Sequence, residues 1–547
     1  MKGAIPMTSP GLDSVTVDII GHNLVAIAEE MGVAMIRAAY SPNIKERRDC
    51  TTALLDTSGH SIAQAEHIPI HMGSMIGFIP GVVAQYGEDI HPGDIFISND
   101  PYLGGSTHLP DVTVVAPLHV DGDLVGFAAA VAHHAEFGGS QGRAPDIYSE
   151  GLRLPILKIV DRGTLDEGLV RLIQLNTRVP DERLGDIRSQ FAAVSLGVRR
   201  YTGLLERYGA DGVLEATGRW LDKAETQAWA ALRELPRGRV QFEDRMDSDG
   251  AGTENIPIRV AIDIDAEGIH FDFTGTGAQV AGQINTARAA VEASVYYTVK
   301  TILDPTLPAN AGFYRIVDIT IPHGSILDSA EPAPVLQRSD VCQRAVDAML
   351  GAFSSILPER IPAASNGSIS AFTFNGYDAL RQRPFAYTEV IAGGAGALPT
   401  TNGQDAVQTH VTNTANTPIE SVEQNFPLRI TKYALRDGSG GAGQRRGGVG
   451  IIRELKTLND GIRLTVKGDR VATGPWGLQG GGAGQPLAFV LDPDSDHSRS
   501  FTRADNGTVL AAETTVLAMT AGGGGFGSPP DTDSVPAADE REGDDVQ

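Results

Sequence analysis

Residues 95–133 read IFISNDPYLGGSTHLPDVTVVAPLHVDGDLVGFAAAVAH. Apolar residues are concentrated in segments 95–98, 111–116 and 124–132, and this pattern predicts three strands. A glycine-containing loop joins the first two strands, and a polar cluster, AHHAEFGG, occupies 132–139 after the third. Because binding and catalytic side chains often lie in loops at the ends of strands, we expect a functional site here.

The loop and the cluster carry imidazoles and carboxylates in an arrangement typical of metal sites. His108 and Asp111 lie three residues apart, the third strand leads into His133, and Asp49 stands just before an earlier predicted strand. Imidazole nitrogens and carboxylate oxygens are ligands of catalytic Zn, Mn or Fe, and four of them leave a position for water or substrate. We therefore predict a divalent metal site formed by Asp49, His108, Asp111 and His133.

The same residues could instead have purely structural roles. In that interpretation, His108 caps a turn, Asp111 accepts hydrogen bonds from backbone amides, and His133 is a half-buried, hydrogen-bonded side chain. Five of the 13 histidines lie near these segments, and this clustering favours the metal site. His134 and Glu136 come next in the sequence and are candidates for orienting a ligand or accepting a proton.

Charge and cysteine content restrict the partners that we expect. The 547 residues carry a net charge of −24 and no basic run with interleaved aromatics, which argues against a nucleic-acid partner. No basic leader followed by an apolar run begins the chain, so we expect no membrane partner either. With only Cys50 and Cys342 available, a disulfide scaffold is not expected, and a cytoplasmic location is predicted.

Other catalytic motifs are weak or missing. The glycine runs at 438–450 and 522–527 contain no G-x-x-x-x-G-K-[ST] phosphate loop, so tight turns or an interface explain them better than nucleotide binding. Cys50, with His60 or His67 as a base, is a weaker candidate nucleophile than a small buried side chain. No G-x-S-x-G elbow supports serine catalysis.

The apolar periodicity changes along the chain. Helical spacing predicts a first helix capped by Ser9 or Asp13 and long helices within 180–235. Apolar residues at every second position predict a hairpin over 51–63 and antiparallel strands over 239–273. Two more helices are predicted over 287–303 and 341–357. The last third has little helix signal and many glycines.

These patterns predict a mixed α/β, multi-domain chain. The expected regions are an N-terminal α/β domain with the metal site over 1–236, a middle region of strands and helix over 237–340, a β-rich, glycine-rich region over 341–527, and a disordered acidic tail over 528–547.

Distinct motifs follow one another through almost the whole chain. They are ERRDC at 46–50, IPIHMGSM at 68–75, the loop 99–111, AHHAEFGG at 132–139, DFTGT at 272–276, NTPIE at 416–420, RRGGVG at 445–450 and the glycine run 522–527. In this order, from Asp13 to about Pro529, the motifs resemble the hydantoinase B/oxoprolinase family, which includes subunits similar to those of caprolactamase and of acetone and acetophenone carboxylases.

The resemblance implies residue roles and a partner. Asp49, His108, Asp111 and His133 match positions that family members use around a metal, whereas many relatives carry Asp where Glu136 stands. The resemblance also implies a hydantoinase A-type partner, which uses ATP and Mg²⁺ to phosphorylate an amide or ketone oxygen, in an α2β2-like hetero-oligomer. The missing phosphate loop agrees with an ATP site on another chain.

The expected activity is ATP-dependent hydrolysis of a cyclic amide such as a hydantoin, 5-oxoproline or a lactam. A metal would activate water for attack on the phosphorylated amide, with Asp49, His134 or Glu136 as the proton acceptor. One alternative is a subunit of a ketone carboxylase, in which the metal holds an enolate for attack on CO₂. The other is a structural subunit of an ATPase complex, with the glycine loops as its interface.

Overall fold

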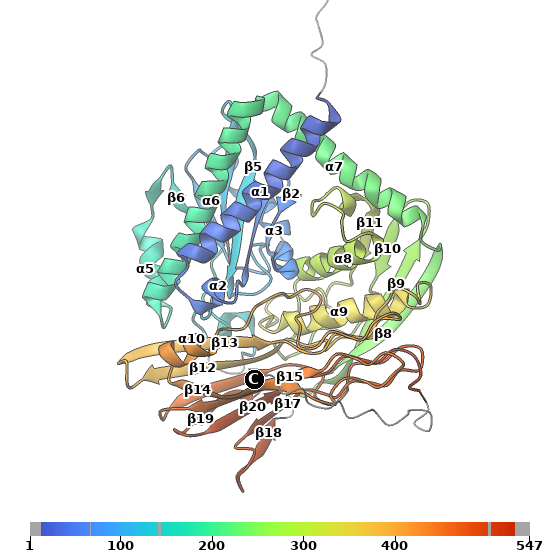
Figure 1. Cartoon of the computed structure of the whole chain (residues 1–547). Coiled ribbons are helices and arrows are strands. Elements are labelled where there is room, and N and C mark those ends of the chain that lie inside the picture. The colour runs from blue at the N-terminus through green and yellow to red at the C-terminus, as the bar shows by residue number, and fades with distance from the viewer. Residues whose placement is uncertain (1–11, 66, 141–143, 502–504, 531–547) are drawn as a thin grey trace, which may run out of the picture.

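The computed structural model describes residues 12–65, 67–140, 144–501 and 505–530. The mixed α/β architecture with several sheets and helices is confirmed. Figure 1 shows the N-terminal helices and the first sheet above a layered set of C-terminal strands. From position 531 onward, the predicted acidic tail lies outside the described residues.

A seven-stranded sheet forms the N-terminal part. Its order is β2-β1-β5-β4-β3-β6-β7, and all paired neighbours run antiparallel. The strands are β1 (Cys50–Leu55), β2 (Ser61–Gln64), β3 (Ile95–Ser98), β4 (Asp111–Val120), β5 (Asp123–His133), β6 (Leu157–Asp161) and β7 (Thr164–Leu165). The predicted hairpin over 51–63 and the three strands within 95–133 are therefore confirmed.

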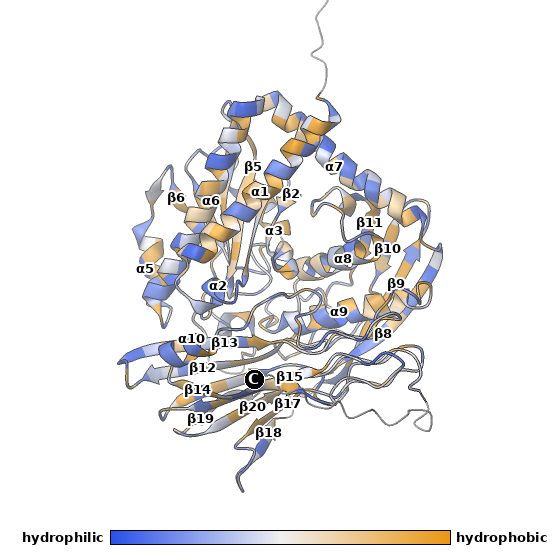
Figure 2. Ribbon diagram, viewed as in Figure 1, coloured by the Kyte–Doolittle hydropathy of each residue, from blue (hydrophilic) through white to orange (hydrophobic). Residues whose placement is uncertain are grey.

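Helices cover both faces of this sheet. One face packs against α1 (Ser14–Ala38), α6 (Pro180–Tyr208) and α7 (Ala210–Arg233), with α2 (Pro42–Lys45) and α5 (Glu167–Leu175) at its margin. The other face packs against η1 (Pro69–Met72), α3 (Gly73–Ile76) and α4 (Phe78–Tyr86). Because both faces of β5 are buried, its sequence is continuously apolar instead of alternating (Figure 2).

Asp13, one of the two residues predicted to cap the first helix, caps α1. Its side chain accepts a hydrogen bond from the Thr16 amide. By length and composition alone, α1 could cross a membrane. Its apolar stripe, however, packs into the core against α6 and α7 (Figure 2), which is the behaviour of a core helix. The cytoplasmic location stays a prediction.

The middle of the chain forms a four-stranded sheet with two buried helices. Its order is β11-β10-β9-β8, antiparallel except for the parallel β10–β11 pair. The strands are β8 (Gly238–Ser248), β9 (Glu254–Ile264), β10 (Ile269–Asp272) and β11 (Val317–Thr320), and the helices are α8 (Arg288–Leu303), α9 (Arg338–Phe353) and the short η3 (Phe313–Ile316). Every residue of α9 is buried, so this helix lies at the centre of the molecule.

Two C-terminal sheets pack on each other through a shared apolar core. The first has the order β13-β12-β16-β19 and the second β14-β15-β20-β17-β18. The strands are β12 (Ser370–Asp378), β13 (Arg383–Ile391), β14 (Leu428–Arg436), β15 (Gly450–Thr457), β16 (Ile462–Lys467), β17 (Ala488–Leu491), β18 (Arg499–Phe501), β19 (Asp505–Leu510) and β20 (Thr515–Met519), with one short helix, α10 (Ile419–Asn425). The β-rich character expected of this region is confirmed.

The glycine runs pack backbone against backbone. Gly523 donates its amide to the Gly448 carbonyl at 2.9 Å and accepts from the Gly441 amide at 2.8 Å. A Cβ atom at Gly523 would lie only 2.0 Å from the Ala395 carbonyl oxygen. Glycine is needed here because the neighbouring main chains leave no room for a side chain. This packing agrees with the structural interpretation of the runs and not with a phosphate loop.

Replacing Gly523 with alanine tests this close packing. Gly523→Ala should lower stability by about 3 kcal/mol or more, or leave the chain insoluble, because main chain must move to admit the methyl group. Gly218→Ala in α7 is the matched control, since nothing lies within 4 Å of its added Cβ. The control should be neutral or stabilising by about 0.5–1 kcal/mol. Equal denaturation midpoints for the two variants would contradict the packing argument.

Candidate metal centre

Strand register brings three of the predicted ligands to one end of the first sheet. Asp111, which opens β4, pairs with His133, which ends β5. On the other side of β5, Cys50 pairs with Ala132, so Asp49 comes to lie beside His133. The backbone amide of His133 donates to the Asp49 carbonyl at 2.9 Å. Antiparallel pairing therefore gathers residues that are up to 84 positions apart in the sequence.

The donor atoms of His108, Asp111 and His133 form a compact cluster, all within 4.8 Å of one another. Asp111 Oδ1 lies 3.0 Å from His108 Nε2 and 2.9 Å from His133 Nδ1. Asp111 Oδ2 instead accepts from Arg338 at 2.7 Å and from Thr107 at 3.1 Å. One carboxylate oxygen is thus anchored, while the other faces the two imidazoles.

Asp111 is completely buried, and its charge is compensated locally. Burial opposes ionisation of this carboxyl, but the positive charge of the Arg338 guanidinium outweighs burial and holds its pKa well below the usual range. Arg338 opens α9, so the ion pair also joins the metal-site sheet to the central helix.

His108 Nε2 lies 3.0 Å from Asp111 Oδ1 and 3.1 Å from His133 Nδ1. Burial and the nearby Arg338 lower the pKa of His108 to about 3, so the ring is neutral. Its Nδ1 lies 3.0 Å from the Leu336 carbonyl oxygen, which only accepts, so Nδ1 donates there and Nε2 carries the lone pair. Two acceptors, His108 Nε2 and Asp111 Oδ1, then face each other. A divalent cation between them would remove this repulsion, so the donor set fits a metal.

Asp49 lies beside this cluster, and His71 lies between its carboxylate and that of Asp111. His71 Nε2 is 3.5 Å from Asp49 Oδ1 and 3.7 Å from Asp111 Oδ1, while its Nδ1 is 3.2 Å from Thr51 Oγ1. His71 was not assigned to the site from the sequence. Its signal was the IPIHMGSM motif, whose short helix η1 holds this ring against the carboxylates.

His134 and Glu136 have partners outside the cluster. The buried ring of His134 lies 3.1 Å from Gln190 Oε1 on α6. Glu136 lines a small cavity over the centre, but its carboxylate binds Arg178 at 2.6 Å and accepts from the Gly138 amide at 2.7 Å. Both side chains therefore support the loop around the centre.

This cavity, of about 120 Å³, opens over His108 and His133. The opposite wall comes from the first C-terminal sheet, more than 230 residues away in the sequence. The residues of this wall are Thr373, Asn375, Thr388, Thr465 and Lys467. The cavity is smaller than the ~300–1,000 Å³ usual for larger ligands. It suits a small molecule and not a nucleotide.

Glu150 also lines the cavity and was not predicted from the sequence. Its Oε1 accepts from the Leu336 amide at 2.8 Å, whereas its Oε2 has no hydrogen-bond partner among the described residues. Burial raises the pKa of Glu150 to about 8, so this carboxyl holds a proton at neutral pH. Nothing in the local sequence marked it, because its burial comes from distant segments.

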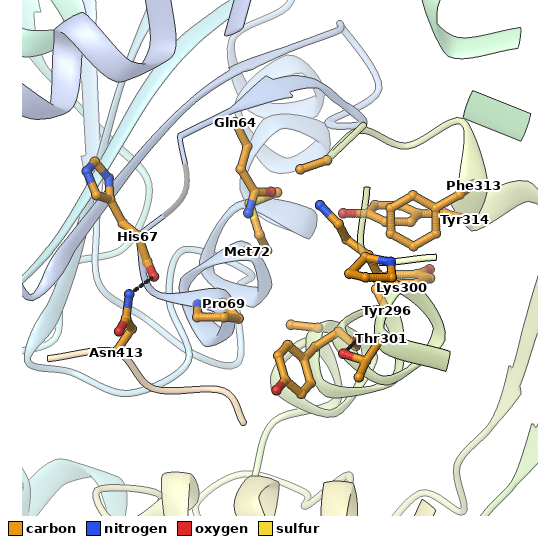
Figure 3. Close-up of a pocket in the computed structure, with 14 residues that line it drawn as sticks. Gln64, His67, Pro69, Met72, Tyr296, Lys300, Thr301, Phe313, Tyr314 and Asn413 are labelled. Carbon is orange, nitrogen blue, oxygen red and sulfur yellow. Dashed lines mark hydrogen bonds between the residues drawn. The ribbon is translucent and has the colours of Figure 1, made fainter. Parts of the chain in front are cut away.

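A larger cavity, about 360 Å³, lies elsewhere (Figure 3). Its wall includes Tyr296 and Tyr314, whose rings stack with centroids 3.8 Å apart, and none of the described residues that line it carries a carboxylate. Pro69 and Met72 of η1 face this cavity, whereas His71 of the same helix faces the metal centre. The larger cavity is therefore separate from the candidate metal site.

The fold and the site define an α/β protein with a buried centre of two histidines and an aspartate. The model of the Hydantoinase B/oxoprolinase family matches residues 13–529, so the chain belongs to this family.

Two relatives differ in how much of their own length this chain matches. It is 30% identical to a B-type D-/L-hydantoinase subunit of Pseudomonas sp. strain NS671 over 540 residues, covering 95% of this chain and 90% of that protein. It is 35% identical to 5-oxoprolinase 1 of Arabidopsis thaliana over 552 residues, covering 94% of this chain but only 42% of that protein. The chain thus spans less than half of the plant relative.

A solved structure supports the same assignment. The ATP-dependent caprolactamase from Pseudomonas jessenii superposes with a TM-score of 0.87 at 26% identity, covering 95% of this chain and 92% of that chain. The arrangement of sheets is therefore shared across almost the whole length.

Removing one donor tests the metal site. Asp111→Asn should lower the content of divalent metal in the purified chain at least tenfold, because an amide cannot supply the anionic oxygen. Elemental analysis measures this, and Asp318→Asn on the exposed edge of β11 is the control expected to keep its metal. Full metal content in both Asp111→Asn and His133→Ala would contradict the site.

The pKa of Glu150 predicts a pH-dependent effect on stability. In the unfolded chain this carboxyl ionises near 4.5, but in the folded protein it keeps its proton to about pH 8. Folding is therefore opposed increasingly as the pH rises between these values. In the chelator-treated chain, Glu150→Gln should raise the free energy of unfolding little at pH 4.5 and most at pH 8.5, by on the order of a few kcal/mol. The exposed control Glu359→Gln should show no such trend, and a pH-independent effect of Glu150→Gln would refute the expectation.

Proposed function

We propose that this chain is the B-type subunit of an ATP-dependent cyclic amide hydrolase of the hydantoinase/5-oxoprolinase type. The observation that carries the proposal is the convergence of His108 Nε2, Asp111 Oδ1 and His133 Nδ1 beneath a small cavity. Membership of the family and the similarity to a hydantoinase subunit, a 5-oxoprolinase and a caprolactamase support it.

A separate A-type subunit would supply the ATP chemistry, in an α2β2-like hetero-oligomer. The sequence contains no P-loop motif, and the cavity over the metal centre is too small for a nucleotide. The plant 5-oxoprolinase extends well beyond the part that this chain matches. These observations favour activation of the substrate outside this sequence, and we assign that step to the A-type subunit.

The chemical problem is the stability of the amide, in which resonance strengthens the C–N bond. Phosphorylation of the carbonyl oxygen by the partner would weaken this resonance before the substrate reaches the cavity. We assign Asp49, His108, Asp111 and His133 as the residues that hold a divalent metal, Zn, Mn or Fe. When bound, such an ion supplies Lewis acidity next to the reacting carbon. Arg338 and Thr107 fix the orientation of Asp111.

Two carboxyl groups would move the protons. Asp49 is the proton acceptor that we prefer among the predicted candidates, because Glu136 is held by Arg178 and His134 faces Gln190. Glu150 is protonated at neutral pH and presents an unpaired oxygen in the cavity, which suits donation to the leaving nitrogen. As water adds to the activated carbon, one of its protons passes to Asp49, the ring C–N bond breaks, and the leaving nitrogen gains a proton from Glu150. The ring-opened product is then an acyl phosphate, and a second water hydrolyses it to the carboxylate and inorganic phosphate.

Reconstitution with an A-type partner tests the function. The pair should open 5-oxoproline, a hydantoin or caprolactam only with ATP and both subunits present. Asp111→Asn or His133→Ala should reduce ring opening at least a hundredfold while the partner still hydrolyses ATP, because activation occurs on the other chain. Chromatography of the open-chain product and an ADP assay measure the two activities, and Asp318→Asn is again the control.

Two results would point to the alternatives. Incorporation of labelled bicarbonate into product with a ketone substrate would favour a carboxylase subunit. Unchanged ring opening in both metal-site variants, together with no metal in the wild-type chain, would favour a structural subunit.

A further inference from the structure

Three polar groups that line the cavity over the metal centre have no hydrogen-bond or ion-pair partner among the described residues. Asn375 Oδ1 and Glu150 Oε2 are buried, each in a residue that is 6% exposed, and neither has a hydrogen-bond partner among the described residues. Lys467 is half-buried, and no hydrogen bond or ion pair joins its ammonium to the part of the chain that the structure describes. Buried polar groups are nearly always paired, so two unpaired buried oxygens beside this ammonium indicate a polar ligand.

The C-terminal sheet presents these groups on one face. Lys467 and Thr465 are two residues apart on β16, and Thr373 and Asn375 are two residues apart on β12. Thr465 pairs directly with Thr373, and Lys467 follows it on the same side. Because side chains two apart in a strand share a face, all four point toward the cavity that they line. The cavity therefore has a polar wall opposite the metal ligands.

The charge on this wall is positive. Among the described residues that line the cavity, Lys467 is the only lysine or arginine, and the carboxylate of Glu136 is already neutralised by Arg178. Burial lowers the pKa of Lys467, and the fields of Asp340 and Asp49 act in the opposite direction. Lys467 is half-buried, so its ammonium is partly withdrawn from water, and a bound anion would offset the cost of this partial desolvation.

Asn375 complements Lys467. Its side-chain amide offers a donor as well as an acceptor, and the pairing of β12 with its neighbours uses the backbone and not this amide. By contrast, the hydroxyls of Thr373 and Thr388 bind each other at 3.0 Å and so are already satisfied in part. Lysine and asparagine together can bind two oxygens of one oxyanion.

We propose that Lys467 and Asn375 form an anion subsite that holds an oxyanion group of the reacting molecule above the metal centre. The oxyanion is either the phosphoryl group added by the partner or a carboxylate carried by the substrate itself. This inference rests on the proposed function for the identity of the molecule, but the subsite itself is defined by binding. The C-terminal sheet thereby contributes to substrate recognition, although the metal ligands all come from the N-terminal sheet.

Anion binding to the purified chain tests the subsite without any turnover. Isothermal titration with inorganic phosphate, acetate and 5-oxoproline is performed on the chelator-treated chain, so that the metal does not bind the anions. At least one of these anions should bind, and Lys467→Met should weaken that binding at least tenfold. Lys467→Arg should restore most of the affinity because the charge is retained. Lys300→Met, which changes the lysine that lines the larger cavity, is the matched control and should bind like wild type.

A second variant keeps the test decisive if Lys467→Met misfolds. Asn375→Asp is nearly isosteric and adds a negative charge, so it should also weaken anion binding at least tenfold while thermal unfolding shows a folded chain. Preference for phosphate would identify the phosphoryl group as the anchor, and preference for acetate and 5-oxoproline would identify a carboxylate. Both results support the subsite.

Two outcomes would overturn the subsite. They are anion affinity that is unchanged in folded Lys467→Met and Asn375→Asp, and absence of binding by all three anions to the wild-type chain. Failure of the proposed hydrolysis would look different, because the reconstituted pair would then not open the ring although anion binding still depended on Lys467.

Discussion

The completely buried carboxylate of Asp111 is the group on which the arrangement of the site depends. An ionised carboxyl without water is very costly unless positive groups and hydrogen bonds compensate it. Here the compensation comes from the Arg338 guanidinium at the start of α9, from the Thr107 hydroxyl in the loop before β4 and from His133 Nδ1 at the end of β5. One charge therefore ties the N-terminal sheet to the central helix, and the same helix packs against the middle sheet.

The N-terminal sheet and the first C-terminal sheet contribute different groups to the cavity. The N-terminal sheet presents the proposed metal ligands at the end where β1, β5 and β4 lie side by side, and residues of the first C-terminal sheet line the same cavity. Close backbone packing of glycine segments such as Gly441, Gly448 and Gly523 helps to hold the C-terminal loops in place. The glycine runs thus act through their main chains and support the fold of the wall that carries Lys467.

Much of the site could be predicted because it depends on segments that are close together in the sequence. His108, Asp111 and His133 are close in sequence, and strands that pair as neighbours bring them together. His71, Glu150 and Lys467 were not assigned, because their roles depend on packing between segments that are far apart. Burial of Glu150 comes from the chain around Leu336, and Lys467 reaches the cavity only once β16 pairs with β12. The predicted domain boundaries remain predictions.

The sequence by itself determined the types and approximate limits of the main elements, since strand and helix periodicities and caps such as Asp13 are local properties. It also indicated the kind of chemistry, through the imidazoles and carboxylates beside the strand ends. Only the tertiary structure decided which of these groups share one centre, which are held elsewhere, as Glu136 is by Arg178, and which distant side chains complete the cavity. The reason is physical, because burial, charge compensation and unpaired polar atoms are properties of packed surfaces and not of local sequence.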